Sequence, residues 1–240
     1  MKRLVLLLGV GAAALLAVGV RPAAATNECR GLLICVKVPG PWVVVPRSAR
    51  APRPQVQFQL SCPRGYVIGG LDAELTNRGI DISFLGMLGS PVGPGTTTSR
   101  SAVFVASYVG PNTATGPASF RPHLGCLPAS GGSGGPVPYR PSPDPVVPPG
   151  EPTVRRVRTV RLHPGLMRGS QACGAGELLV SGWSAVAFFT ARPPTSELIS
   201  SVATAQRIRG GRVSVVARAG VAVAGVRAIV QVGAVCAGGR

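Results

Sequence analysis

Residues 62–72 read Cys-Pro-Arg-Gly-Tyr-Val-Ile-Gly-Gly-Leu-Asp, and residues 173–183 read Cys-Gly-Ala-Gly-Glu-Leu-Leu-Val-Ser-Gly-Trp. Each stretch begins at a cysteine, passes a glycine-bearing turn and continues into an apolar strand that ends at small residues. A second cysteine follows each stretch, Cys126 after 64 residues and Cys236 after 63 residues. A frame that recurs in this way indicates an internal duplication. It predicts two units, each closed by its own disulfide.

The cysteines indicate an oxidising compartment. The chain has six of them, an even number, which in an exported protein favours disulfides over metal ligands or redox pairs. Six cysteines permit fifteen pairings, and sequence alone does not select one. The repeated frame favours three pairs: Cys62 with Cys126, Cys173 with Cys236, and Cys29 with Cys35. A bridge that closes a loop of the longer kind stabilises its unit by about 4 kcal/mol.

The first 25 residues have the layout of a secretory signal peptide. Lys2 and Arg3 precede an apolar run at 4–20, and the alanines at 23–25 provide a cleavage site of small residues. The alternative is a retained membrane anchor, because a run of seventeen residues is at the lower limit of a bilayer span. No other segment of the sequence is comparably long and apolar. We therefore expect a protein that is secreted or associated with the cell envelope.

Composition divides the rest of the chain into four parts. They are a front segment with Cys29 and Cys35 at 26–54, a first β unit at 55–128, a linker at 129–152, and a second β unit at 153–240. The linker is rich in glycine and serine, then in proline. A glycine- and serine-rich segment behaves as a flexible coil, and a proline-rich segment is stiffer and extended. The linker therefore predicts two units that move semi-independently.

Apolar and polar residues alternate in both units, which is the period of a half-buried strand. Residues 55–60 alternate strictly, and much of 157–162 does so too. Several short strands separated by turn residues favour a sandwich of two sheets. Gly69-Gly70 and Ser181-Gly182 lie where a strand would bend or bulge. The expected fold is all-β, with two tandem disulfide-closed β-sandwich or jelly-roll-like domains joined by the linker.

Positive charge is concentrated in the second unit. Twelve basic and two acidic residues give 153–240 a net charge of +10, whereas 26–128 carries +5. Such a field attracts anionic envelope polymers or lipid headgroups, although GC-rich codon usage also enriches arginine. The candidate polyanion-binding residues are Arg155, Arg156, Arg158, Arg161, Arg207, Arg209 and Arg212. The alternative for those at 155–161 is an edge strand that charge protects from aggregation. We do not expect nucleic acid as a partner.

We predict no catalytic residue, metal or cofactor. The sequence has no nucleophile elbow and no phosphate-binding loop in a strand-turn-helix setting. Asp72 and Glu74 share a strand face and could offer oxygens to calcium with Asp81, but a solvated acidic face is the ordinary explanation. The competing hypothesis is a secreted hydrolase that uses His123 with Asp72 or Asp81. A third is a module that binds another surface protein through an exposed apolar patch.

Residues 62–70 resemble the Cys-Pro-x-Gly…Gly-Gly modules of uncharacterised secreted proteins from GC-rich Gram-positive bacteria. Those modules also close with a terminal cysteine. The resemblance implies disulfide-closed β domains of the cell surface or secretome and implies no activity. The second unit departs from the motif, with Gly174 in place of the proline and Ser181-Gly182 in place of the double glycine. The resemblance therefore gives no reason to expect that both units bind the same ligand.

Overall fold

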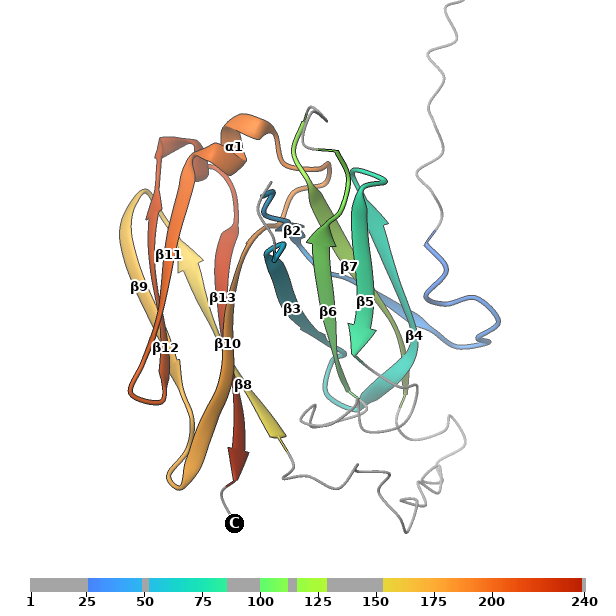
Figure 1. Ribbon diagram of the computed structural model, residues 1–240. Coiled ribbons are helices and arrows are strands. Elements are labelled where there is room, and N and C mark those ends of the chain that lie inside the picture. Colours follow the sequence, from blue (N-terminus) through green and yellow to red (C-terminus); the bar gives the residue numbers. More distant parts are fainter. Residues whose placement is uncertain (1–25, 49–51, 86–99, 112–115, 129–152, 239–240) are drawn as a thin grey trace, which may run out of the picture.

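The computed structural model describes residues 26–48, 52–85, 100–111, 116–128 and 153–238 (Figure 1). The predicted signal peptide at 1–25 and the predicted linker at 129–152 lie outside the described residues. In the part that is described, no helix is long and apolar enough to cross a bilayer.

Strands make up nearly all of the regular structure, which confirms the all-β prediction. The first half contains β1 (Val36–Pro39), β2 (Trp42–Val44), β3 (Gln55–Ser61), β4 (Tyr66–Leu75), β5 (Ile80–Leu85), β6 (Ser101–Tyr108) and β7 (Ser119–Pro128). The second half contains β8 (Thr153–Leu162), β9 (Gly165–Ala172), β10 (Glu177–Phe188), β11 (Val202–Arg209), β12 (Arg212–Ala219) and β13 (Ala228–Gly238). A short helix α1 (Ser196–Ser200) and a 3-10 turn η1 (Val221–Val223) complete the second half.

The strands form three antiparallel sheets. A seven-stranded sheet has the order β1-β7-β2-β10-β13-β8, with β4 on the other edge of β7. Two three-stranded sheets, β3-β6-β5 and β11-β12-β9, lie beside it, one in each half (Figure 1). Each half is thus a pair of sheets whose inward side chains form a core, as in other sheet-on-sheet folds.

The two halves have the same strand order. In the small sheets, β3-β6-β5 corresponds to β9-β12-β11, and in the large sheet the pair β4–β7 corresponds to β10–β13. Both pairs contain a register shift, between Ile68 and Gly70 in β4 and between Leu179 and Ser181 in β10. These shifts confirm the predicted irregularities at the two small-residue pairs.

All three predicted disulfides are present, Cys29–Cys35, Cys62–Cys126 and Cys173–Cys236. Each long bridge starts at the residue that follows β3 or β9 and ends in the last strand of its half, so it fastens the small sheet to the large one. The described part of the chain has no free cysteine. Three disulfides of this kind indicate an oxidising, extracellular environment.

The halves are joined by one sheet and one core. Strand β2 pairs with β7 of its own half and with β10 of the other half, through Val43 with Ala187 and Trp42 with Phe188. The core of the first half also includes Trp183 from β10. These contacts do not fit the semi-independent movement that the linker predicts. Two separate domains are not seen, although the strand order still distinguishes two halves.

Candidate functional site

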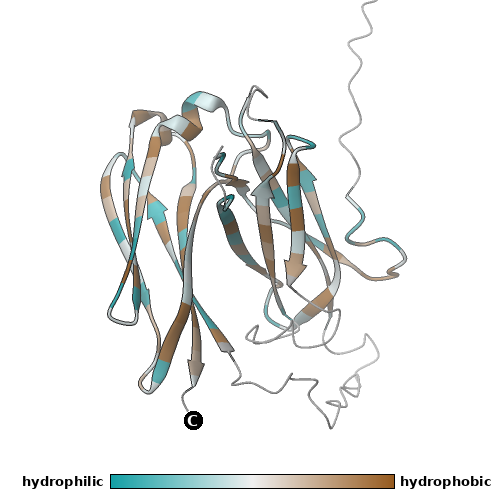
Figure 2. Cartoon of the chain, viewed as in Figure 1, coloured by the Kyte–Doolittle hydropathy of each residue, from teal (hydrophilic) through white to brown (hydrophobic). Residues whose placement is uncertain are grey.

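The outer face of the sheet β11-β12-β9 is rich in arginine. Alternation along β12 turns Val213, Val215 and Ala217 into the core and leaves Arg212 and Arg218 outside. Figure 2 shows this alternation of hydrophilic and hydrophobic residues on the strands of this sheet. The exposed arginines on this outer face, here called the arginine face, are Arg168, Arg207, Arg209, Arg212 and Arg218.

Strand pairing places these arginines relative to one another. Gly210 and Gly211 form a two-residue turn with φ values of 56° and 69°, and such a turn requires glycine or a similar residue at both positions. The turn sets Arg209 directly opposite Arg212. The Arg212 guanidinium donates a hydrogen bond of 3.0 Å to the Ser170 hydroxyl of β9. The local sequence therefore fixes two cations at one end of the face.

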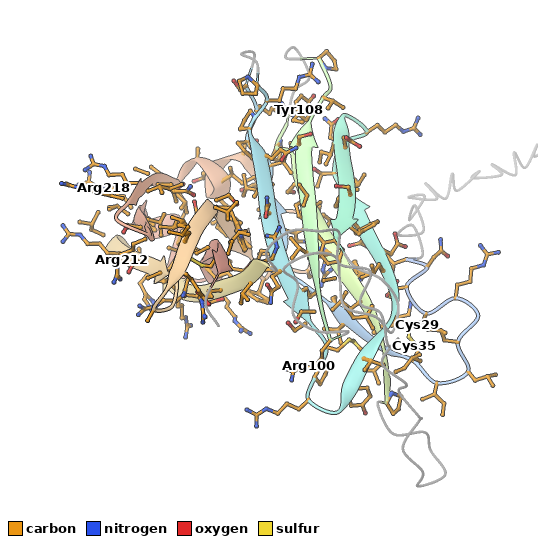
Figure 3. The ribbon with its side chains drawn as sticks, turned by 60° about the horizontal axis from the view of Figure 1, so that its bottom comes forward. Cys29, Cys35, Arg100, Tyr108, Arg212 and Arg218 are labelled. Atoms are coloured by element: carbon orange, nitrogen blue, oxygen red, sulfur yellow. A yellow bond between two sulfur atoms is a disulfide. The ribbon has the colours of Figure 1, made fainter. Side chains whose placement is uncertain are left out.

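The arginine face extends along the strands. Arg218 lies six residues after Arg212 on β12, and at the rise of a β-strand this separation is about 20 Å. Arg168 is on β9, opposite Val216, so along the strand direction it lies between Arg212 and Arg218. Figure 3 shows Arg212 and Arg218 directed away from the body of the protein. An extended ligand could touch several of these cations at once.

Within the described residues, no arginine of the arginine face forms an ion pair with a carboxylate. Strands β9, β11 and β12 contain no aspartate or glutamate, and Glu177 and Glu197 are the only acidic residues in 153–238. Glu177 is already paired with Arg156, whose Nε donates to the carboxylate at 2.8 Å. This contact and a backbone hydrogen bond from Gly174 lower the pKa of Glu177 to about 2. Among the described residues, the positive charge of this face is therefore not paired with negative charge.

The predicted arginines of β8 lie elsewhere. Arg155 donates a hydrogen bond to the Gln57 side chain of the first half, and burial lowers its pKa. Arg156 is committed to Glu177. Arg158 and Arg161 are exposed, but they belong to β8, which pairs only with β13 among the described strands. Three of the seven predicted residues thus lie on the arginine face, and the sequence analysis missed Arg168 and Arg218.

Two residues of the hydrolase hypothesis, His123 and Asp72, lie beneath the front segment. His123 is 7% exposed, and its Nδ1 lies 3.6 Å from Glu28 while its Nε2 lies 3.5 Å from Glu74. Asp72 is opposite His123 in the register but accepts a hydrogen bond from the backbone of Asn27. Asp81 is on β5, in another sheet. The structure therefore brings Asp72 to His123 and keeps Asp81 away from it.

The close approach of the front segment explains why positions 70 and 125 are occupied by glycine. A Cβ atom added at Gly70 or Gly125 would lie 1.8 Å or 2.0 Å from the backbone oxygen of Glu28. A side chain at either position would push this segment away from the sheet. The double glycine of the opening motif thus serves both the bulge in β4 and the docking of Glu28.

The structure shows one cluster with the spacing of a metal site, formed by Cys173, Glu177 and Cys236 within the described residues. The two sulfur atoms are bonded to each other, so they are not thiolate ligands. Glu177 is held by Arg156. This cluster is a disulfide beside an ion pair.

We expect Glu28 to make docking of the front segment sensitive to acid. Burial raises the pKa of this carboxyl, but hydrogen bonds from Thr26 and its own backbone and the charges of Lys37 and His123 outweigh burial, and the pKa is lowered from 4.5. A group whose pKa is lowered in the folded state stabilises it above the ordinary pKa, and this contribution is lost as the pH falls through the lowered value.

The melting temperature of the wild-type protein should therefore fall more steeply below about pH 4.5 than that of Glu28→Gln. The measurement is thermal unfolding from pH 7 to pH 2. Glu177 is present in both proteins, so the difference between the two profiles isolates Glu28. If the melting temperatures of the two proteins fell in parallel with pH, Glu28 would not be the source of the acid sensitivity.

The fold and the site define a class of protein, a disulfide-closed all-β protein with a cationic sheet face. Comparison with protein-family models, with curated proteins and with solved structures found no match.

Proposed function

We propose that this is an exported, non-catalytic binding protein that holds anionic envelope polymers on the arginine face. The observation that carries the proposal is the set of five exposed arginines on one sheet face that has no carboxylate. The signal-peptide pattern and the three disulfides support export.

The geometry of the face suits an extended, repeating polyanion. Alternate residues of a strand are about 6.6 Å apart, so Arg207 and Arg209 can meet successive charges along one chain. Arginine also binds phosphate or carboxylate through two parallel hydrogen bonds, which lysine does not do. Several weak contacts of this kind add up along a polymer, whereas a single small anion gains only one or two.

We expect Arg207→Ser/Arg212→Ser to weaken polyanion binding about 30-fold, since each cation near an anionic surface contributes about 1 kcal/mol. The measurement is titration with a polyphosphate chain of fixed length, together with retention on purified cell envelope at rising salt. Salt should weaken the wild-type interaction because it screens exposed charges.

Arg158→Ser/Arg161→Ser is the matched control, because it removes the same charge from exposed positions outside the arginine face. It should retain most of the affinity. Equal losses in the two variants would mean that net charge, rather than this face, drives binding. Retention that ignores ionic strength, or no retention at all, would count against the proposal.

The alternative remains a secreted hydrolase. The observation in its favour is the placement of His123 between the carboxylates of Glu28 and Glu74. If the purified protein hydrolyses any substrate, His123→Ala should abolish that activity, and unchanged activity would dispose of this alternative.

We also propose that the two halves arose by duplication of one unit. The common strand order, the matching register shifts and the matching long disulfides support it. The halves have since diverged. In the first half, His123 lies three residues before the closing cysteine and is opposite Asp72. The corresponding pair in the second half is Gly233 and Trp183, and Trp183 packs against the first half.

A further inference from the structure

The loop closed by Cys29 and Cys35 presents apolar side chains to solvent. Leu33 is 104% exposed, Ile34 is 58% exposed, and Val36 at the start of β1 is 40% exposed. Burial of such residues is what stabilises a fold, so exposed ones contribute nothing to the stability of this protein. We call residues 32–36 the apolar loop.

The apolar loop has an inner and an outer side. Leu32 points to the body of the protein, since a Cβ atom at Gly69 would lie 2.9 Å from its Cδ1. The next two residues, Leu33 and Ile34, are turned outward. The disulfide at the base of the loop restrains it, and Figure 3 shows Cys29 and Cys35 at the base of a loop that projects from the body. The loop therefore holds two large apolar side chains away from every core of the molecule.

The exposed charges beside the apolar loop are positive. Arg30 precedes it and Lys37 follows it, and both are exposed. The nearby carboxylate, Glu28, is buried against the sheet and lies 3.5 Å from the Lys37 ammonium. Glu28 therefore offsets the charge of Lys37, and Arg30 has no ion pair among the described residues. An apolar tip beside a cation matches the layers of an anionic membrane, in which acyl chains lie beneath negative headgroups.

We propose that the apolar loop inserts Leu33 and Ile34 into the surface of a bilayer that contains anionic lipids. This inference is independent of polymer binding, because the arginine face lies on the opposite side of the molecule from the loop (Figures 1 and 3). Both surfaces can be occupied at once. A protein with this geometry links a membrane to an envelope polymer that lies above it.

The test uses vesicles of phosphatidylcholine with 30% phosphatidylglycerol (roughly the charge density at which basic segments bind) and the protein collected after secretion. Leu33→Ser/Ile34→Ser should reduce vesicle binding about 100-fold, close to tenfold for each apolar side chain. Leu178→Ser/Val221→Ser is the matched control, because these residues are 75% and 85% exposed in the second half. It should bind as the wild type does.

A second arm separates the loop from the arginine face. At high salt, adsorption through exposed charges is screened. Under this condition Arg207→Ser/Arg212→Ser should bind these vesicles as tightly as the wild type does. If this variant loses vesicle binding and the loop variant keeps it, the arginine face is the lipid contact and the inference is wrong. Failure of polyphosphate binding alone would leave the membrane result unchanged.

A third measurement reports insertion itself. Leu33→Trp should show a blue shift of tryptophan emission on addition of vesicles and quenching by brominated acyl chains. Trp42 and Trp183 are each 5% exposed and give a constant background. Emission that does not change on addition of vesicles, or an absence of binding by the wild-type protein, would overturn the proposal, and the apolar loop would then be the binding site of another protein.

Discussion

Replacement of Cys173 and Cys236 by serine is expected to lower the free energy of unfolding by about 4 kcal/mol, because the bridge closes a loop of more than sixty residues. Cys236 is completely buried in β13, and the bridge ties this strand to the end of β9 in the other sheet. The second half has no other disulfide between its sheets among the described residues. A domain of ordinary stability has only about 5–15 kcal/mol in total, so the loss is a large fraction.

Denaturant titration of the oxidised variant and wild type measures this loss. Cys29→Ser/Cys35→Ser is the control, since its bridge spans six residues and the same relation predicts about 2 kcal/mol. The ratio of the two losses is the informative quantity. If removal of the short bridge costs as much as removal of the long one, loop closure is not what the long bridge supplies.

Gln231→Ala is expected to lower the free energy of unfolding by about 2 kcal/mol, because two partly buried backbone groups of Gln59 would each lose their partner. Gln231 is 5% exposed on β13. Its side-chain oxygen accepts from the Gln59 backbone N–H at 2.7 Å, and its amide nitrogen donates to the Gln59 carbonyl at 3.0 Å. Strand β3 is at the edge of its sheet, and this side chain satisfies the outward backbone N–H and C=O of Gln59 at that edge.

Amide hydrogen exchange at Gln59 and denaturant titration together test this role. Gln171→Ala is the matched control, because the Gln171 side chain bonds only the neighbouring Ala172 carbonyl. Exchange at Gln59 should become faster in the Gln231 variant alone. Unchanged protection of that amide would mean that the contact between β3 of the first half and β13 of the second half does not depend on Gln231.

The sequence was informative wherever a pattern was local or repeated. The repeated cysteine frame predicted the disulfides, and strict alternation at residues 55–60 predicted β3. Residues 196–200 form the helix α1, in a half for which strands alone are expected from the sequence. A signal for this helix was present, since Thr195 is a favourable N-cap, and its hydroxyl accepts from the Leu198 N–H.

Other features depend on partners that are distant in the sequence. Strands β1 and β2 are short and are separated by Gly40-Pro41, and they persist because β7 and β10 pair with them. Arg168 joins the arginine face only through the register between β9 and β12. Alternation along β12 alone could have placed Arg218 on the same sheet face as Arg212, because they are an even number of residues apart.

The docked front segment has a consequence for assembly. In the second half, the side of β10–β13 that carries Trp183 and Gln231 is the platform on which the first half rests. The matching side of β4–β7 is polar and is occupied by Glu28. An uncovered sheet face of this kind is a surface that could associate with another molecule. The front segment thus covers the face of the first half that corresponds to this platform.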